Sequence, residues 1–136
     1  MSQHTKISII GAGSVVFSLG LVKDLCLTES LAGSQICFMD IDEERLDMIY
    51  QLGTRYAGEL GADLRFEKTL DRGVALHEAN FVINTAAVHD EYHSRDLRDI
   101  ADRHGYYYGG RISLPFYQID LMLSIARDME RTCPDA

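Results

Sequence analysis

The sequence of 136 residues has no tryptophan, only two prolines and only three cysteines. Cys26, Cys37 and Cys133 are widely spaced and form no Cys-x-x-Cys pair, which argues against a disulfide framework and a zinc knuckle. This cysteine usage fits a reducing compartment, so we expect a cytoplasmic protein. The sequence also contains no proline-rich or low-complexity linker, and its length fits one domain.

Basic residues are scarce as well. Lys and Arg total 13 against 21 Asp and Glu, which gives a formal net charge of −8. An acidic surface repels phosphate backbones and anionic lipids, so we expect neither nucleic acid nor membrane as a partner. The apolar stretch at residues 7–22 is broken by Gly11 and Gly13, and no A-x-A cleavage site follows it. We therefore interpret it as a buried strand turning into a helix, not as a membrane span or signal peptide.

The sequence does contain a regular alternation of strand and helix patterns. Short runs rich in β-branched residues predict four buried strands, at residues 6–10, 35–39, 63–68 and 80–85. Helical patterns between and after them cover residues 14–28, 42–61, 72–78, 92–104 and 113–132. Buried strands joined by helical crossovers predict the α/β class, a doubly wound, Rossmann-type parallel sheet with helices on both faces.

Several residues set the expected ends and faces of these helices. Asp42 is expected to cap the second helix and Gly61 to stop it, whereas Ser113 caps the last helix with Pro115 in its first turn. The expected buried face of the first helix consists of Phe17, Leu21, Leu25 and Thr28. The methionines expected in the core are Met122 and Met129.

The most informative motif is G-A-G-S-V-V-F, which follows the first strand directly and opens the first helix. Its first glycine, Gly11, permits a tight turn, and its second, Gly13, lets the backbone approach a pyrophosphate. The helix N-terminus supplies N–H donors, and Ser14 can both cap the helix and donate to a phosphate oxygen. Val16 stands where the full dinucleotide fingerprint has a third glycine. By itself the pattern therefore leaves open a nucleotide site or a packing turn.

Acidic and polar residues at the strand ends favour the nucleotide site. Asp40 ends the second strand, where a carboxylate accepts hydrogen bonds from ribose hydroxyls and repels a 2′-phosphate, so NAD is favoured over NADP. The alternative, a residue that only starts a turn and caps the next helix, fits Asp42 better. Asn84, Thr85 and Ala86 follow the fourth strand at the same edge of the sheet. The Asn84 side chain either binds ribose or a backbone group, or simply ends the strand.

Together with the runs M-D-I-D-E-E-R-L-D (residues 39–47) and F-V-I-N-T-A (residues 81–86), this motif resembles glycoside hydrolase family 4. The likeness is greatest to its α-glucosidase and α-galacturonidase branch, and it continues through the tyrosine turn at residues 105–109. The resemblance implies bound NAD, with the pyrophosphate at the glycine turn and the ribose at Asp40. The cofactor-binding residues expected from motif and resemblance are Gly11, Gly13, Ser14, Val15, Val16, Phe17, Asp40, Asn84, Thr85 and Ala86.

The resemblance also implies an exception to two-carboxylate glycoside hydrolysis. In this family NAD⁺ takes a hydride from the sugar C3, and a divalent metal, commonly manganese, polarises the resulting ketone. A base then removes the C2 proton, and the glycosidic bond breaks by elimination. The family's metal ligands and base lie beyond the segment that this chain resembles, so we assign no catalytic and no metal-binding residue, and Cys133 receives no metal role. The substrate would be a small glycoside.

Residues 1–136 are accordingly expected to form one NAD-binding domain, the N-terminal part of a longer architecture, truncated after about four strands and inactive alone. In a sheet ordered 3-2-1-4-5, loss of the fifth strand leaves the fourth as an apolar edge, so we expect a homo-oligomer. Two other functions remain open: the cofactor domain of a lactate/malate-type 2-hydroxy-acid dehydrogenase, and a non-catalytic NAD-binding module. His89 and His93 are four residues apart, but a solvated loop explains them better than a metal site.

Overall fold

The structure is a computed structural model that describes residues 5–88, 91–106 and 110–136. These residues divide into two compact units, residues 5–86 with 128–136 and residues 87–127. The first unit holds the sheet, and the second holds α4 and most of α5. In chain order the elements are β1 (Lys6–Ile10), α1 (Val15–Leu27), the 3-10 turn η1 (Glu29–Leu31), β2 (Gln35–Met39), α2 (Glu43–Leu60), β3 (Arg65–Thr69), α3 (Arg72–Leu76), β4 (Phe81–Asn84), α4 (Glu91–Arg103) and α5 (Gly110–Thr132).

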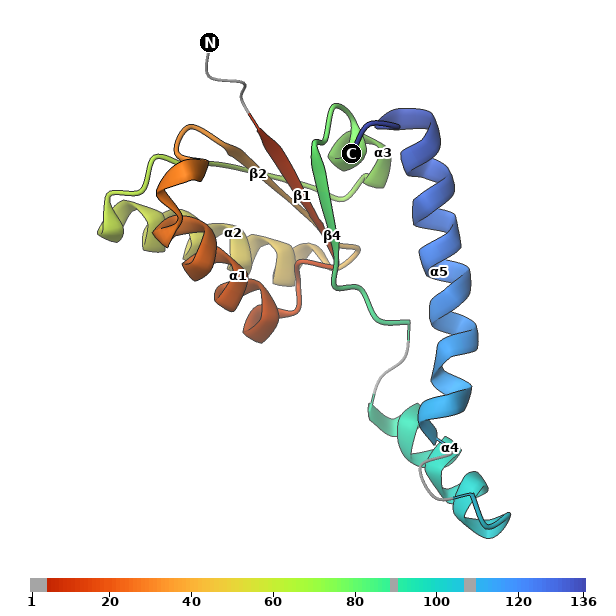
Figure 1. Ribbon diagram of the computed structural model, residues 1–136. Helices are drawn as coiled ribbons and strands as arrows, with labels where there is room; N and C mark the ends of the chain where they lie inside the picture. The colour runs from red at the N-terminus through yellow and green to blue at the C-terminus, as the bar shows by residue number, and fades with distance from the viewer. Residues whose placement is uncertain (1–4, 89–90, 107–109) are drawn as a thin grey trace. The chain divides into compact units, whose positions relative to one another are not determined.

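All four strands are parallel and lie in the order β3-β2-β1-β4 (Figure 1). Ile7 and Ile9 of β1 belong to the core beneath α1 and α2. Ser8 points to the opposite face, where its hydroxyl donates to the Ala75 carbonyl of α3 at 2.6 Å. Because side chains alternate along a strand, α3 covers the face opposite to α1 and α2. The doubly wound α/β fold predicted from the sequence is confirmed.

The core of the first unit is the layer between the sheet and the helices α1 and α2. Phe38 is fully buried there, and its ring stacks on that of Phe66 with 5.5 Å between centroids. Asp42 caps α2 by accepting a hydrogen bond from the Arg45 amide, and Gly61 ends the helix in the left-handed conformation, both as predicted. The buried residues of this layer are Ile7, Ile9, Ala12, Val22, Ile36, Phe38, Leu46 and Ile49.

The buried face of α1 agrees only in part with the predicted one: Leu21 and Leu25 pack against the core as expected, but Phe17 and Thr28 do not. Ser18 and Val22 are fully buried, whereas Phe17 is 61% exposed and Thr28 is exposed. The Ser18 hydroxyl donates to the Ala12 carbonyl at 2.7 Å, so this polar group is satisfied on the buried side of the helix. Hydrophobicity alone does not identify a serine as part of a buried face.

The start and face of α5 also correct the prediction. The helix begins at Gly110, so Ser113 and Pro115 lie within it and not at its start. Met122 is 54% exposed and is not a core residue, whereas Met129 is half-buried. The unit of residues 87–127 contains, among its described elements, only α4 and part of α5. None of the described helices combines the length and apolar composition needed to cross a bilayer.

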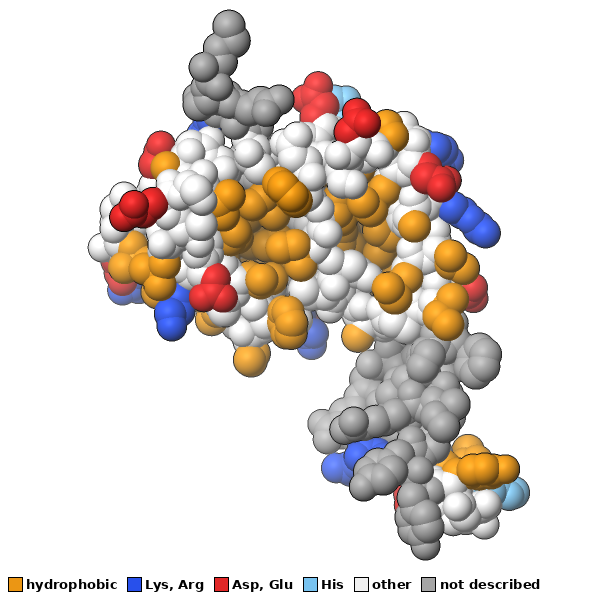
Figure 2. Space-filling view, viewed as in Figure 1, with side chains coloured by type: hydrophobic (Ala, Val, Ile, Leu, Met, Phe, Trp, Pro, Cys, Tyr) orange, Lys and Arg blue, Asp and Glu red, His pale blue; other side chains and the backbone are white. Residues whose placement is uncertain are grey.

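The outer edge of β4 is the apolar edge expected from the sequence. Within the part of the chain that the structure describes, β4 pairs with β1 and with no other strand. Phe81 at its start is 59% exposed. Figure 2 shows hydrophobic side chains gathered between α1 and β4 on the viewed face. An edge of this kind carries no charged residue or proline that would block pairing with a further strand.

Replacing Glu78 by glycine is expected to raise the free energy of unfolding by about 0.5–1 kcal/mol. Glu78 joins α3 to β4 with φ of +56°, the one left-handed non-glycine residue among those described. Glycine adopts this conformation without a Cβ clash, whereas alanine does not. Urea denaturation of Glu78→Gly and Glu78→Ala measures the difference. An equal effect of the two variants would show that the backbone conformation is not strained.

Candidate functional site

The carboxyl ends of β1, β2 and β4 meet around the turn of residues 11–13. The amides of Gly11 and Ala12 both donate to the Met39 carbonyl at the end of β2, at 2.8 and 3.0 Å. On the other side, the Thr85 amide donates to the Ile10 carbonyl at 2.8 Å. The turn is therefore held between the ends of two neighbouring strands, at the edge where parallel α/β sheets bind ligands.

Gly11 is required by the close approach of a second segment. Its φ is +83°, and a Cβ built on it would lie 2.4 Å from both the Cα and the amide nitrogen of Ala86. No real Cβ contact to backbone is that short, so the segment after β4 passes where a side chain would be. The glycine predicted for a tight turn thus serves the contact between two strand ends as well.

Asp40 lies directly against the turn. Its Oδ2 accepts a hydrogen bond from the Gly13 amide at 2.7 Å, and its Oδ1 accepts one from the Asp42 amide at 3.0 Å. A Cβ on Gly13 would come within 2.8 Å of Oδ2, so the second glycine makes room for this carboxylate. Each ionised carboxylate oxygen can accept a further hydrogen bond. Of the two aspartates weighed from the sequence, Asp42 is the helix cap and Asp40 faces the glycine turn.

The free N–H donors at this edge belong to α1, not to the glycine turn. The amides of Gly11, Ala12 and Gly13 are used within the turn, and the first bond of the helix runs from the Ser18 amide to the Ser14 carbonyl at 2.9 Å. The preceding amides, including those of Val16 and Phe17, therefore have no acceptor within the helix. Together with the positive end of the helix dipole, they can bind an anion.

The side chains of the first turn of α1 are open. Ser14 is exposed and makes no side-chain capping bond, contrary to its predicted role as cap, since its ψ of 84° departs from the extended backbone of a capping residue. Val16 is 90% exposed and Phe17 is 61% exposed. Val15 begins α1, and its side chain lies outside the described part of the chain.

Two hydroxyls and one amide at the site are directed at backbone groups. The Thr85 Oγ1 lies 2.9 Å from the Gly11 carbonyl oxygen and 3.1 Å from that of Ile10. The Asn84 Oδ1 accepts a hydrogen bond from the Ala86 amide at 3.1 Å, which is the backbone and turn role among the alternatives for this residue. Ser18 supports the turn from beneath, and sequence reasoning missed it. Its only signal was a serine at helical spacing from Val22 on an otherwise apolar face.

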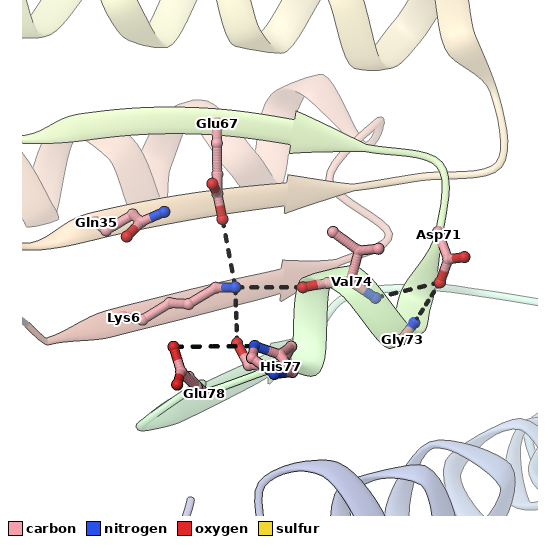
Figure 3. A pocket seen from close by; sticks show the side chains of 8 residues that line it. All are labelled: Lys6, Gln35, Glu67, Asp71, Gly73, Val74, His77 and Glu78. Atoms are coloured by element: carbon pink, nitrogen blue, oxygen red, sulfur yellow. Dashed lines mark hydrogen bonds and ion pairs between the residues drawn. The ribbon is translucent and has the colours of Figure 1, made fainter.

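A cavity of about 560 Å³ lies at the opposite, amino end of the strands, between the sheet and α3 (Figure 3). The Lys6 ammonium donates to the carbonyls of His77 at 2.9 Å and Val74 at 3.3 Å, and it lies 3.4 Å from Glu67. The Asp71 carboxylate caps α3. These charged groups are engaged in holding α3 to the sheet, so the cavity is best explained by packing.

Two ionisable groups near this cavity, Cys37 and Glu67, have shifted pKa values. Burial raises the pKa of the Cys37 thiol to about 12, and its hydrogen bond to the Glu67 carboxylate acts in the same direction against the opposing charge of Lys6. For Glu67, burial raises the pKa, but the hydrogen bond from Cys37 and the charge of Lys6 outweigh it, and the net pKa is lowered.

The Cys37 thiol is expected to make the protein less stable at alkaline pH. Below about pH 9 the thiol is protonated in both folded and unfolded chains. Between pH 9 and 12 only the unfolded chain loses the proton, so the free energy of unfolding falls by about 1.4 kcal/mol per pH unit from this group. Urea denaturation at several pH values should show a steeper fall for the unmodified chain than for Cys37→Ala. Parallel curves would contradict the assignment.

Among the described side chains, no group of three or more His, Cys, Asp and Glu residues is placed to hold a metal ion. His89 lies outside the described residues, and the side chain of His93 lies outside the described part of α4. The expectation of a solvated loop therefore remains a prediction for His89, whereas it is wrong for His93, which lies in the first turn of α4. The tyrosines at 107 and 108 lie outside the described residues as well.

The chain is similar to known glycosidases over nearly all of its length. Residues 6–136 match the family described as Family 4 glycosyl hydrolase. An α-galactosidase of Bacillus subtilis (strain 168) is 34% identical over 146 aligned positions, which cover 96% of this chain and 32% of that protein. The chain therefore spans about a third of the length of the curated relatives it matches.

Solved structures show the same fold. A 6-phospho-α-glucosidase from gut microorganisms, in complex with NAD and Mn²⁺, superimposes with a TM-score of 0.84 at 20% identity, covering 98% of this chain and 32% of that one. The lactate dehydrogenase of Cryptosporidium parvum, in complex with lactic acid and NAD, gives a TM-score of 0.69 at 18% identity, covering 100% of this chain and 36% of that one. Structural likeness at this identity establishes the fold, whereas the family match over residues 6–136 establishes descent: the chain belongs to the family 4 glycosyl hydrolases.

Proposed function

We propose that this chain is the NAD-binding portion of an NAD- and metal-dependent glycosidase. The observation that carries the proposal is the junction of three strand ends, where Gly11 and Gly13 are kept free of side chains by Ala86 and Asp40. This places a carboxylate next to a helix N-terminus with unused N–H donors. A ribose and a pyrophosphate need these two kinds of group side by side.

The residues of the site fit NAD in two places. The amides of Val16 and Phe17 and the exposed Ser14 hydroxyl would bind the pyrophosphate, because they are donors at the positive end of α1. The outward lone pairs of Asp40 would accept the two ribose hydroxyls, because its other lone pairs already hold the Gly13 and Asp42 amides. Val15 and the segment of residues 84–86 would line the same crevice.

The described side chains include no group of three or more His, Cys, Asp and Glu residues that could hold a manganese ion. When bound, NAD supplies a hydride acceptor for oxidation at the sugar C3, which acidifies the neighbouring C–H. This chain's own residues bind and orient the nucleotide. Catalysis on a small glycoside requires catalytic groups other than the described residues, and the 136-residue chain alone is expected to be inactive.

Titration with NAD⁺, NADP⁺ and S-adenosylmethionine tests the proposed cofactor. We expect saturable binding of NAD⁺, weaker binding of NADP⁺ because the Asp40 carboxylate repels a 2′-phosphate, and no binding of S-adenosylmethionine. Isothermal titration calorimetry measures all three under one condition. Equal affinity for NAD⁺ and NADP⁺ would contradict the role of Asp40, and absence of NAD⁺ binding would overturn the proposal.

The dehydrogenase alternative rests on the shared fold with lactate dehydrogenase. The family match favours the glycosidase, since it reaches through residue 136, whereas a cofactor fold alone hosts many activities. NAD⁺ binding does not separate the two functions. A comparison of two activities does separate them: hydrolysis of a glycoside, and oxidation of a 2-hydroxy acid in the presence of NAD⁺. Both are measured on a protein that also carries the catalytic residues.

Self-association through the β4 edge is part of the proposal. We expect the unmodified chain to form oligomers at high concentration and Phe81→Lys to shift the population toward monomers, because a charge on an edge strand blocks strand pairing. Leu27→Lys is the matched control, since Leu27 on α1 is equally exposed, 59% for each side chain. Sedimentation velocity measures the distribution. A monodisperse monomer for the unmodified chain would rule the oligomer out.

A further inference from the structure

We propose that Thr85 is a positioning residue of the nucleotide site, an inference that rests on the proposed function. Its hydroxyl lies 2.9 Å from the Gly11 carbonyl oxygen and 3.1 Å from the Ile10 carbonyl oxygen. A threonine hydroxyl has one proton to donate, and both neighbours are acceptors only. The hydroxyl is therefore committed to the backbone of β1 and its turn, not to a ligand.

The Gly11 carbonyl is the group through which this bond acts. Besides the Thr85 hydroxyl, it accepts the longer bond from the Ser14 amide, at 3.3 Å, which closes the turn directly before α1. The backbone amide of Thr85 binds the Ile10 carbonyl instead, at 2.8 Å. The Thr85 side chain therefore makes a short hydrogen bond to the Gly11 carbonyl, which the backbone amide of Thr85 does not reach. This carbonyl belongs to the peptide that leads into the first turn of α1.

Fixing that peptide fixes the direction of the donors beyond it. The Gly11 carbonyl and the Ala12 amide belong to one planar peptide group, and the Ala12 amide is bound to the Met39 carbonyl at 3.0 Å. Thr85 therefore holds one end of this plane from β4 while Met39 holds the other from β2. The free amides of α1 begin three residues later, so their direction depends on how firmly this plane is held.

The consequence is an effect on affinity without contact to the nucleotide. With the hydroxyl present, the turn is held in its binding conformation; without it, other turn conformations are populated, and the apparent dissociation constant rises in inverse proportion to the remaining fraction. Loss of one hydrogen bond of ordinary strength shifts the equilibrium between turn conformations by about fivefold, which sets the upper limit of the weakening. Removal of a residue in direct contact with the anion would weaken binding by a larger factor.

The test compares three variants of the 136-residue chain. Thr85→Val keeps the shape but removes the hydroxyl, and Thr85→Ser keeps the hydroxyl. Ser8→Ala is the matched control. Ser8 of β1 is fully buried, and its hydroxyl also donates to a backbone carbonyl, that of Ala75 at 2.6 Å, but on the face of the sheet that α3 covers. The readouts are the dissociation constant for NAD⁺ and the hydrogen-exchange rates of the Gly11 and Ala12 amides by NMR.

We expect Thr85→Val to weaken NAD⁺ binding by up to about fivefold and to speed exchange of both amides. Thr85→Ser should restore both values, and Ser8→Ala should lower stability without changing the affinity. Unchanged affinity in Thr85→Val, or a loss that serine does not restore, overturns the inference. If the unmodified chain does not bind NAD⁺, the proposed function fails. The exchange rates of the Gly11 and Ala12 amides still test whether Thr85 positions the turn. Faster exchange in Thr85→Val, but not in Thr85→Ser or Ser8→Ala, supports this role, and unchanged rates overturn it.

Discussion

Replacing Gly11 by alanine is expected to lower the free energy of unfolding by about 3 kcal/mol or more and to abolish NAD⁺ binding. Two costs add at this position. The φ of +83° is unfavourable for any residue with a Cβ, and that Cβ would meet the Ala86 backbone at 2.4 Å. Neither neighbour can move away easily, because the turn is bonded to Met39 and the segment after β4 is bonded to Ile10. Urea denaturation and calorimetric titration measure the two effects.

Gly20→Ala provides the control for this variant. Gly20 lies in the middle of α1 with nothing within 4 Å of an added Cβ, so alanine is expected to stabilise the helix by about 0.5–1 kcal/mol. The two glycines belong to the same strand–turn–helix segment, and opposite signs are expected for them. A Gly11→Ala variant as stable as Gly20→Ala would show that the two strand ends do not approach as closely as described.

Asp40→Asn is expected to weaken NAD⁺ binding by about 10- to 100-fold. The substitution removes the charge that strengthens hydrogen bonds to ribose hydroxyls. Both carboxylate oxygens of Asp40 accept hydrogen bonds from backbone amides, those of Gly13 and Asp42. In asparagine one of these oxygens is replaced by an NH₂ donor, so one of the two amides loses its acceptor. Discrimination against NADP⁺ should fall at the same time, because the repulsion of the 2′-phosphate is lost.

Asp42→Asn is the matched control for charge. It removes one negative charge two residues away, but asparagine caps a helix as well as aspartate does, so α2 and the affinity for NAD⁺ should both be retained. Titration of both variants with NAD⁺ and NADP⁺ separates the local contact from the general effect of net charge. Similar affinities in the two variants would contradict a specific role for Asp40.

The strands were predictable because their physical cause, a short apolar run, is local, and their order followed from the fold class that the strand–helix alternation predicts. The runs I-S-I-I and I-C-F-M are buried on both faces, and β1 and β2 begin and end at the predicted residues. β3 and β4 carry exposed and half-buried residues, which weaken the hydrophobic pattern, and their predicted ends differ from the observed ones by one or two residues. The burial of Ser18 on α1 was not predictable from hydrophobicity, because its hydroxyl is satisfied by a hydrogen bond to the turn.

At the site, the sequence was sufficient to identify which residues come together but not what each one bonds. Gly11, Gly13 and Asp40 were predicted at one edge, and the structure brings them there. That the turn amides would be consumed by Met39 and Asp40 could not be predicted, because these bonds depend on the register between β1 and β2. Whether the assembled residues bind NAD remains a prediction.

The position of β1 in the sheet has a consequence for the order in which the chain folds. β1 is synthesised before the other three strands of the sheet, yet it lies between β2 and β4, and the bond between the Lys6 amide and Asn80 spans 74 residues. Closing so long a loop is entropically slow, so β1, β2 and α2 can associate early, while completion of the sheet awaits the ribosome's release of residues far downstream. A nascent chain stalled before residue 81 would expose the flank of β1 to chaperones.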